Sequence, residues 1–384
     1  MIKRLFALLF AVVLLSGCWG VRNIDHLLYI HSIGIDYKDG KMVLYVQLIN
    51  FSGLAKVEAG GTREQATVSV GKATGETFDL AAHNLYRSIQ QMVSWGHVKS
   101  LVFTKRALRP DVIRNVIDLL NRYNEIRHTI WVYATDTSLE KLFQSTPLLL
   151  ASSYYSFLSN PEELFRQSSF IRPIRLNRFI AHIDEPAMTT RLPYLSLAKK
   201  EWTEDKKNKP MLVLKGACFL HNYKLQGCAR ISEVKGIRWV EQDIRRTPLA
   251  LKKKGKTAAT LIIREPHAEW AMKREGGADR IQLRVRAVGT IIEQNEPLSW
   301  PQLVRLSKEA IEQEIRGTYQ WGAARGIDTL NISDVLYRNN LSEWRRLSVN
   351  GTVPLDDGIL PSISVDLAIS AGGKEKINYR AGDV

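Results

Sequence analysis

The sequence lacks the short motifs that identify several large enzyme classes. Gly255-Lys256-Thr257 lacks the glycine that a phosphate-binding P-loop carries five residues before its Gly-Lys pair. There is no Gly-x-Ser-x-Gly nucleophile elbow, and the eight histidines are scattered without zinc-ligand spacing. We therefore expect a protein that is not an enzyme, with no cofactor, no catalytic residues and no metal site.

Cysteine is also scarce, since the chain has only three, which excludes a dense disulfide framework. Cys218 and Cys228 flank His221–Lys224, a predicted hairpin turn. With 222–224 as the loop, the two cysteines fall opposite each other across the strands. Cross-strand neighbours lie about 5 Å apart, close enough for a disulfide. The alternative is a pair of buried free thiols that pack as small hydrophobic side chains.

Long hydrophobic runs are absent except at the start of the chain. The run Leu5–Leu15 follows Lys3-Arg4 and is shorter than the ~20 residues that span a bilayer, which is typical of an export signal. It ends in Leu-Ser-Gly-Cys18, which resembles the cleavage site of bacterial lipoproteins. Cys18 would then carry a diacylglyceryl group, and two acyl chains give a stable membrane anchor. The alternative is a plain secretory signal with a chance cysteine.

The charge balance is basic, at +15 for the whole chain. Two clusters contribute strongly, Lys206–Lys209 and the stretch from Arg245 to Lys256. Neither has the interleaved aromatic residues of a base-stacking surface, so we expect no nucleic-acid partner. Solvated loops are the simpler interpretation of both clusters. A basic exported chain suits an anionic membrane surface, which we expect it to meet through the lipid anchor.

Composition and pattern indicate an α+β fold. Apolar residues make up 45% and charged residues 24%, as in globular proteins, and the length allows two or three domains. Helical and strand patterns are mixed without strict alternation, which favours mixed domains with largely antiparallel sheets. We predict a cleaved lipoprotein signal peptide at 1–17, an N-terminal α+β domain at 18–185, a small middle domain at 186–255 and a C-terminal α+β domain at 256–384.

Within this frame, a strand–helix–strand unit stands out. Residues 98–103 and 126–133 have strand composition, and the helix between them opens at Pro110 and runs to about Tyr123. Before this unit, strand-like segments at 28–36 and 42–51 flank Asp39-Gly40, which predicts a hairpin turn. Residues 52–65 are interpreted as a loop, and apolar spacing predicts a helix over 78–92. After the unit, the charged segment 199–210 is interpreted as a loop.

In the C-terminal part, strands are predicted at 257–264, 281–292 and 362–369. A long helix should open at Ser299, because Ser299 and Gln302 have capping-box spacing.

Taken in order, the segments resemble the spore-germination lipoprotein family Ger(x)C, the C subunit of nutrient germinant receptors. The resemblance covers nearly the whole mature chain, and each piece is short. It rests on Cys18-Trp19, Ile33–Asp36, Gly96–Lys99, Gly216–Phe219, Leu225–Gly227, Glu233–Trp239, Asp328, Ile332, Asp334, Val335–Tyr337, Trp344 and Val365–Ile369. The chain departs from the family pattern at Cys218 and Cys228 and at residues 19–24.

The resemblance implies a non-enzymatic receptor subunit of three mixed α/β domains. It implies a location on the outer face of the inner spore membrane, beside two polytopic membrane subunits of the same receptor. The germinant and the partner-binding face do not follow from it. Two other functions compete with this one. A lipid-anchored solute-binding protein of a transporter would have two similar βαβ lobes, whereas only one clear βαβ unit is predicted. An anchored wall-modifying enzyme would need catalytic residues that the sequence does not display.

Overall fold

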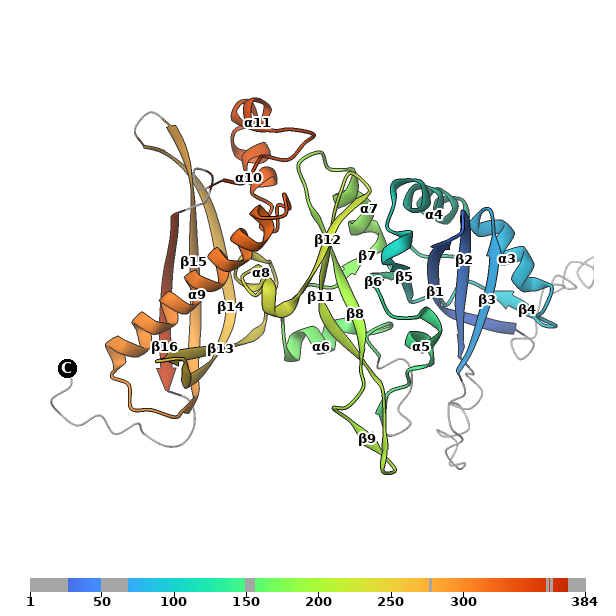
Figure 1. Ribbon diagram of the computed structural model, residues 1–384, viewed down its shortest axis with the longest axis horizontal. Helices are drawn as coiled ribbons and strands as arrows, with labels where there is room; N and C mark the ends of the chain where they lie inside the picture. The colour runs from blue at the N-terminus through green and yellow to red at the C-terminus, as the bar shows by residue number, and fades with distance from the viewer. Residues whose placement is uncertain are drawn as a thin grey trace, which may run out of the picture.

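The computed structural model describes residues 27–49, 68–148, 156–275, 278–356, 359 and 362–371. The predicted signal peptide and Cys18 lie outside these residues, as does the whole of the loop predicted at 52–65. The described chain forms a ten-stranded and a four-stranded β-sheet with helices packed on them, and a small two-stranded sheet (Figure 1). None of its helices has both the length and the apolar character needed to cross a membrane.

The larger sheet has ten strands in the order β12-β11-β8-β6-β5-β1-β2-β3, with β4 beside β1 and β7 beside β6. Its strands are β1 (Leu27–Lys38), β2 (Lys41–Ile49), β3 (Val68–Gly75), β4 (Met92–Ser94), β5 (Ser100–Thr104), β6 (Trp131–Thr135), β7 (Ile174–Arg175), β8 (Thr190–Ala198), β11 (Met211–His221) and β12 (Lys224–Arg230). The predicted turn at Asp39-Gly40 joins β1 and β2, and both of its residues have positive φ, as a two-residue hairpin turn requires.

Parallel strands occupy the centre of this sheet. The predicted strand–helix–strand unit is confirmed, since β5 and β6 pair in parallel and α4 (Pro110–Arg122) connects them. Every residue of β5 and β6 is buried, because both faces of the sheet are covered. One face packs against α3 (Phe78–Tyr86), α4 and α7 (Leu176–Asp184), and the other packs against α5 (Leu139–Gln144). A further helix, α6 (Pro161–Gln167), lies near β8 and β11.

The smaller sheet has four strands in the order β13-β14-β15-β16. They are β13 (Arg246–Lys253), β14 (Lys256–Glu275), β15 (Ala278–Gln294) and β16 (Ser362–Ala371). Helix α9 (Trp300–Ala323) crosses one face of this sheet (Figure 1). It opens with the predicted capping box of Ser299 and Gln302. Two short helices, α10 (Ile332–Asn339) and α11 (Leu341–Leu347), precede β16.

Several local predictions need correction. The helix predicted over 78–92 ends at Tyr86, because Met92–Ser94 pair with the start of β1 as a strand. The loop predicted at 199–210 contains a small hairpin of β9 (Thr203–Glu204) and β10 (Lys207–Asn208). The basic stretch 245–256, interpreted as a loop, contains β13 and the turn at Lys254-Gly255 that leads into β14.

The α+β class is confirmed, with antiparallel pairing in most of both sheets. The domain limits at 185 and 255 stay a prediction. The larger sheet continues across residue 185, because β8, β11 and β12 extend it beyond β6. Between the sheets lie the short helices η5 (Ile231–Glu233) and α8 (Ile237–Val240).

Candidate interaction site

The segment Glu233–Trp239, one of those on which the family resemblance rests, joins the two sheets. Arg238 is buried and donates from Nη2 to Glu314 of α9 at 2.7 Å, while its Nη1 donates to Thr247 of β13 at 2.9 Å. The indole Nε1 of Trp239 donates to the same carboxylate at 2.8 Å. Glu314 thus accepts from two neighbouring side chains, and this buried pair fixes α8 against α9.

Gly236 is needed at this junction because the backbones approach too closely for a side chain. A Cβ there would lie 2.4 Å from the carbonyl oxygen of Glu314. The glycine N–H donates to Thr318 Oγ1 at 2.8 Å. Close by, Trp321 of α9 stacks obliquely on Phe219 of β11 with ring centroids 5.9 Å apart. The junction therefore combines a buried ion pair with apolar packing.

Asp328 holds the start of α10 in a second buried contact. It is 3% exposed and accepts from the backbone N–H groups of Ile332 at 2.9 Å and Ser333 at 2.6 Å. Burial raises the pKa of this carboxyl, and the two N–H donors oppose that rise. Beside it, the side chain of Asn331 accepts from the N–H of Thr189 at 2.8 Å, which ties α10 to the larger sheet.

Asp36 plays a comparable part inside the larger sheet. It lies on β1 and accepts from Thr104 Oγ1 at 2.5 Å and from the guanidinium of Arg106 at 2.5 Å. The hydrogen bond that Arg106 donates to Asp36 is the main cause of the raised pKa of the Arg106 guanidinium. Asp36, Asp328 and Glu233–Trp239 thus each make buried structural contacts, in separate parts of the fold.

Cys218 and Cys228 lie opposite each other in the β11–β12 register, as predicted, and the structure joins them as a disulfide. The turn differs from the prediction, because it consists of Asn222 and Tyr223 alone, both with positive φ. The register is nevertheless kept, since an irregularity between Phe219 and Leu220 compensates for the shorter loop. The disulfide in the exported protein stays a prediction, which thiol titration of the purified chain would test.

A buried polar cluster surrounds His31 at the centre of the larger sheet. Its Nδ1 lies 2.9 Å from Gln47 Oε1, and its Nε2 lies 2.7 Å from Ser159 Oγ. Ser32 also contacts Gln47, at 2.9 Å. Burial is the main reason why the pKa of His31 falls to about 4, so the imidazole is neutral near pH 7. No local sequence pattern predicts this cluster, because its members come from distant segments.

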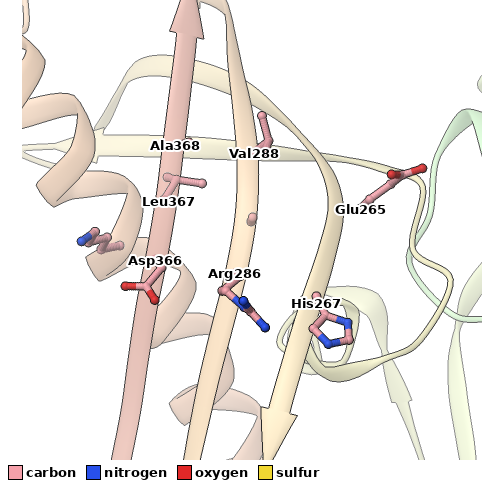
Figure 2. Close-up of a pocket in the computed structure, with 9 residues that line it drawn as sticks. Glu265, His267, Arg286, Val288, Asp366, Leu367 and Ala368 are labelled. Atoms are coloured by element: carbon pink, nitrogen blue, oxygen red, sulfur yellow. The ribbon is translucent and has the colours of Figure 1, made fainter.

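The smaller sheet leaves one face open, and a hollow of about 550 Å³ lies on it (Figure 2). Polar and charged side chains from three strands line it, as Figure 2 shows for Glu265 and His267 on β14, Arg286 on β15 and Asp366 on β16. Lys308 of α9 also lines this hollow. Arg284 donates to Asp366 at 2.6 Å, and Arg286 pairs with Glu269. Both pairs are exposed to solvent, so each contributes little to stability.

A second cavity, of about 330 Å³, lies between α6 and strands β6, β8 and β11. Its lining is mainly aliphatic and aromatic, and no lining residue is charged. Elsewhere in the described chain, no group of three or more His, Cys, Asp or Glu side chains is placed to hold a metal ion.

Comparison with known protein families identifies two that match this chain. The family described as "Spore germination protein N-terminal domain" matches residues 20–197, and "Spore germination B3/GerAC like, C-terminal" matches residues 215–350. The chain belongs to the spore germination GerAC family. The resemblance found in the sequence is thereby confirmed.

Individual relatives are more distant. The chain is 25% identical over 381 residues to spore germination protein KC of Bacillus subtilis (strain 168), covering 94% of this chain and 92% of that protein. Among solved structures, it is similar to the crystal structure of the GerBC protein at 16% identity, covering 88% of this chain and 96% of that chain with a TM-score of 0.47.

Proposed function

We infer that this GerAC-family chain is a non-catalytic subunit of a nutrient germinant receptor. The match to both halves of the family, over 20–197 and 215–350, carries the proposal. The geometry supports it, since the residues behind the resemblance form structural contacts and the open charged face offers a contact surface. We further propose that Cys18 anchors the chain to the outer face of the inner spore membrane, beside two polytopic subunits.

A germination assay tests the receptor role. Spores lacking this chain should keep their refractility in a mixture of nutrients and lose it normally with a non-nutrient trigger. The control restores the intact chain from a second locus. Full nutrient germination of the deletion spores, with all related chains also deleted, would contradict the proposal.

The anchor has its own test. Cys18→Ala should leave the body folded but release it from membranes, and the chain should no longer incorporate labelled fatty acid. Ser16→Ala is the matched control, because it keeps a small residue before the cysteine and should remain membrane-bound. Equal membrane retention and labelling of Cys18→Ala would refute the lipid anchor while leaving the receptor role open.

A solute-binding protein of a transporter is the second candidate. That class is expected to have two similar βαβ lobes, whereas the larger and smaller sheets of the described chain differ in size and strand order, with ten strands in one and four in the other. The uncharged lining of the apolar cavity also gives no partner to the charged groups of a free amino acid. These observations favour the receptor subunit.

A further inference from the structure

The last strand of the fold lies at the edge of the smaller sheet. β16 pairs in parallel with β15 along its whole length, and no described strand lies on its other side (Figure 1). An edge strand presents a row of backbone N–H and C=O groups that can pair with another strand. Proteins usually block such edges with proline, lysine, bulges or very short strands.

Two other edge strands, β13 and β12, carry such blocks in their own sequences, and β16 does not. β13, at the opposite edge of the same sheet, has Pro248 in its middle and Lys252-Lys253 at its end. β12, at one edge of the larger sheet, has seven residues and includes Lys224 and Arg230. β16 has ten residues, with no proline, lysine, arginine or glycine. Its single charge is Asp366, which Arg284 of the same sheet already neutralises.

The two faces of β16 differ sharply. A row of aliphatic side chains turns toward α9 and joins the core of the C-terminal part: Ile363, Val365, Leu367 and Ile369. Val365 is buried, and the other three are only partly buried. The opposite face carries Ser362, Ser364, Asp366, Ala368 and Ser370. An added strand would therefore gain backbone hydrogen bonds and cover an apolar row that the edge leaves partly exposed.

This pattern is self-complementary in one antiparallel register. If Leu367 lies opposite its own copy, Val365 faces Ile369 and Ser364 faces Ser370 of the second strand. Asp366 then faces Ala368. Centring the pair on Asp366 instead would place two carboxylates opposite each other, which is destabilising. A two-fold axis through Leu367 thus extends the apolar row and keeps the two Asp366 carboxylates out of direct opposition.

We propose that β16 pairs with β16 of a second copy of this chain, in the register that places Leu367 opposite Leu367. The two four-stranded sheets become one continuous eight-stranded sheet with both α9 helices on the same face. This interface goes beyond the proposed receptor role and does not depend on it, because it rests on the strand pattern alone.

Cysteine crosslinking of the full chain in its own membranes tests the register. Ser364→Cys and Ser370→Cys each lie on the open face, so neither should disturb the core. Each variant alone should give no dimer under mild oxidation, since like positions are far apart. Co-expressed with different tags, the two variants should give a mixed disulfide dimer. Leu367→Cys should crosslink to itself. Absence of both crosslinks, self-crosslinking of Ser364→Cys, or crosslinking to a different protein would overturn the proposal.

A blocking substitution gives the second measurement. In the proposed register Ala368 faces Asp366 of the second copy, so Ala368→Asp places two carboxylates opposite each other on both sides of the two-fold axis. It should abolish the mixed Ser364→Cys and Ser370→Cys crosslink. Val288→Asp is the matched control, because Val288 is the neighbour of Ala368 on β15, on the same exposed face but one strand inward. It should leave the crosslink unchanged. Equal yields with both aspartate variants would refute edge pairing even if some dimer persists.

Discussion

The larger and the smaller sheet differ in how many of their faces are covered by helices. In the larger sheet, the central strands β5 and β6 are buried at every position because helices cover both faces. In the smaller sheet, residues along β15 alternate between buried and exposed, because α9 covers one face only. The first arrangement maximises apolar burial, whereas the second leaves a surface that another molecule can use.

Two ion pairs, one at the junction of the sheets and one on the open face of the smaller sheet, differ in exposure in the same way. Arg238 and Glu314 form a pair whose side chains are 4% and 18% exposed, at the junction of the two parts. Arg286 and Glu269 form a pair on the open face whose side chains are 52% and 40% exposed. Two ion pairs of the same chemistry therefore have different roles, and substitutions can separate them.

The largest expected effect is at the junction. Glu314→Ala leaves Arg238 as a buried charge without its partner and should lower the free energy of unfolding by about 3–5 kcal/mol. Glu269→Ala removes an exposed partner and should change it by about 0–1 kcal/mol. Urea denaturation of the detergent-solubilised chain measures both. A similar decrease in the free energy of unfolding for the two variants would contradict the different roles of the two ion pairs.

Apolar truncation gives the next test. Leu101 on β5 is fully buried, so Leu101→Ala should cost about 2–5 kcal/mol through lost burial and a residual cavity. Val288 is 52% exposed on β15, and Val288→Ala should cost less than about 0.5 kcal/mol. Thermal melting of both variants measures the difference. A large destabilisation by Val288→Ala would show that the face is covered.

The smallest effect is tied to pH and confined to the larger sheet. His31 has a pKa of about 4 when folded and an ordinary value of 6.5 when unfolded. Between pH 6.5 and pH 4 the unfolded chain binds a proton on His31 that the folded chain does not bind. The contribution of neutral His31 to the free energy of unfolding is therefore fully present above about pH 6.5 and declines toward pH 4. The full loss is on the order of 3 kcal/mol, of which only part develops by pH 5.

His31→Gln should flatten this decline, although the substitution lowers stability at neutral pH by disturbing the cluster. The measurement is the free energy of unfolding of both chains from pH 7 to pH 4.5. Parallel curves for the two chains would show that His31 does not titrate in this way.

Much of the fold could be predicted where the signal is local. Pro110 marked the start of α4, Ser299 and Gln302 marked the start of α9, and Asp39-Gly40 marked a hairpin. The missed strand β13 shows the limit of this approach. Thr247, Leu249 and Leu251 are buried at alternate positions, as in a half-buried strand. The strand was missed because basic residues flank this pattern and Pro248 interrupts it.

The candidate contacts could be predicted only in part. The opposition of Cys218 and Cys228 followed from one turn, because only ten residues separate them. Arg238 and Glu314 are 76 residues apart, and His31 and Ser159 are 128 apart. No periodicity within one segment encodes such pairs, since they depend on how separate elements pack. The openness of one face of the smaller sheet likewise becomes visible only when α9 is placed.

The parallel pairing of β15 with β16 also sets an order of events during synthesis. Arg284 is matched with Ser364, so this pairing waits until the ribosome has made nearly the whole chain. All strands of the larger sheet have been made once residue 230 is complete. The nascent chain therefore has its N-terminal part ready to fold long before its C-terminal part can close. Premature release between codons 231 and 361 yields a polypeptide that has every strand of the larger sheet but lacks β16 of the smaller one.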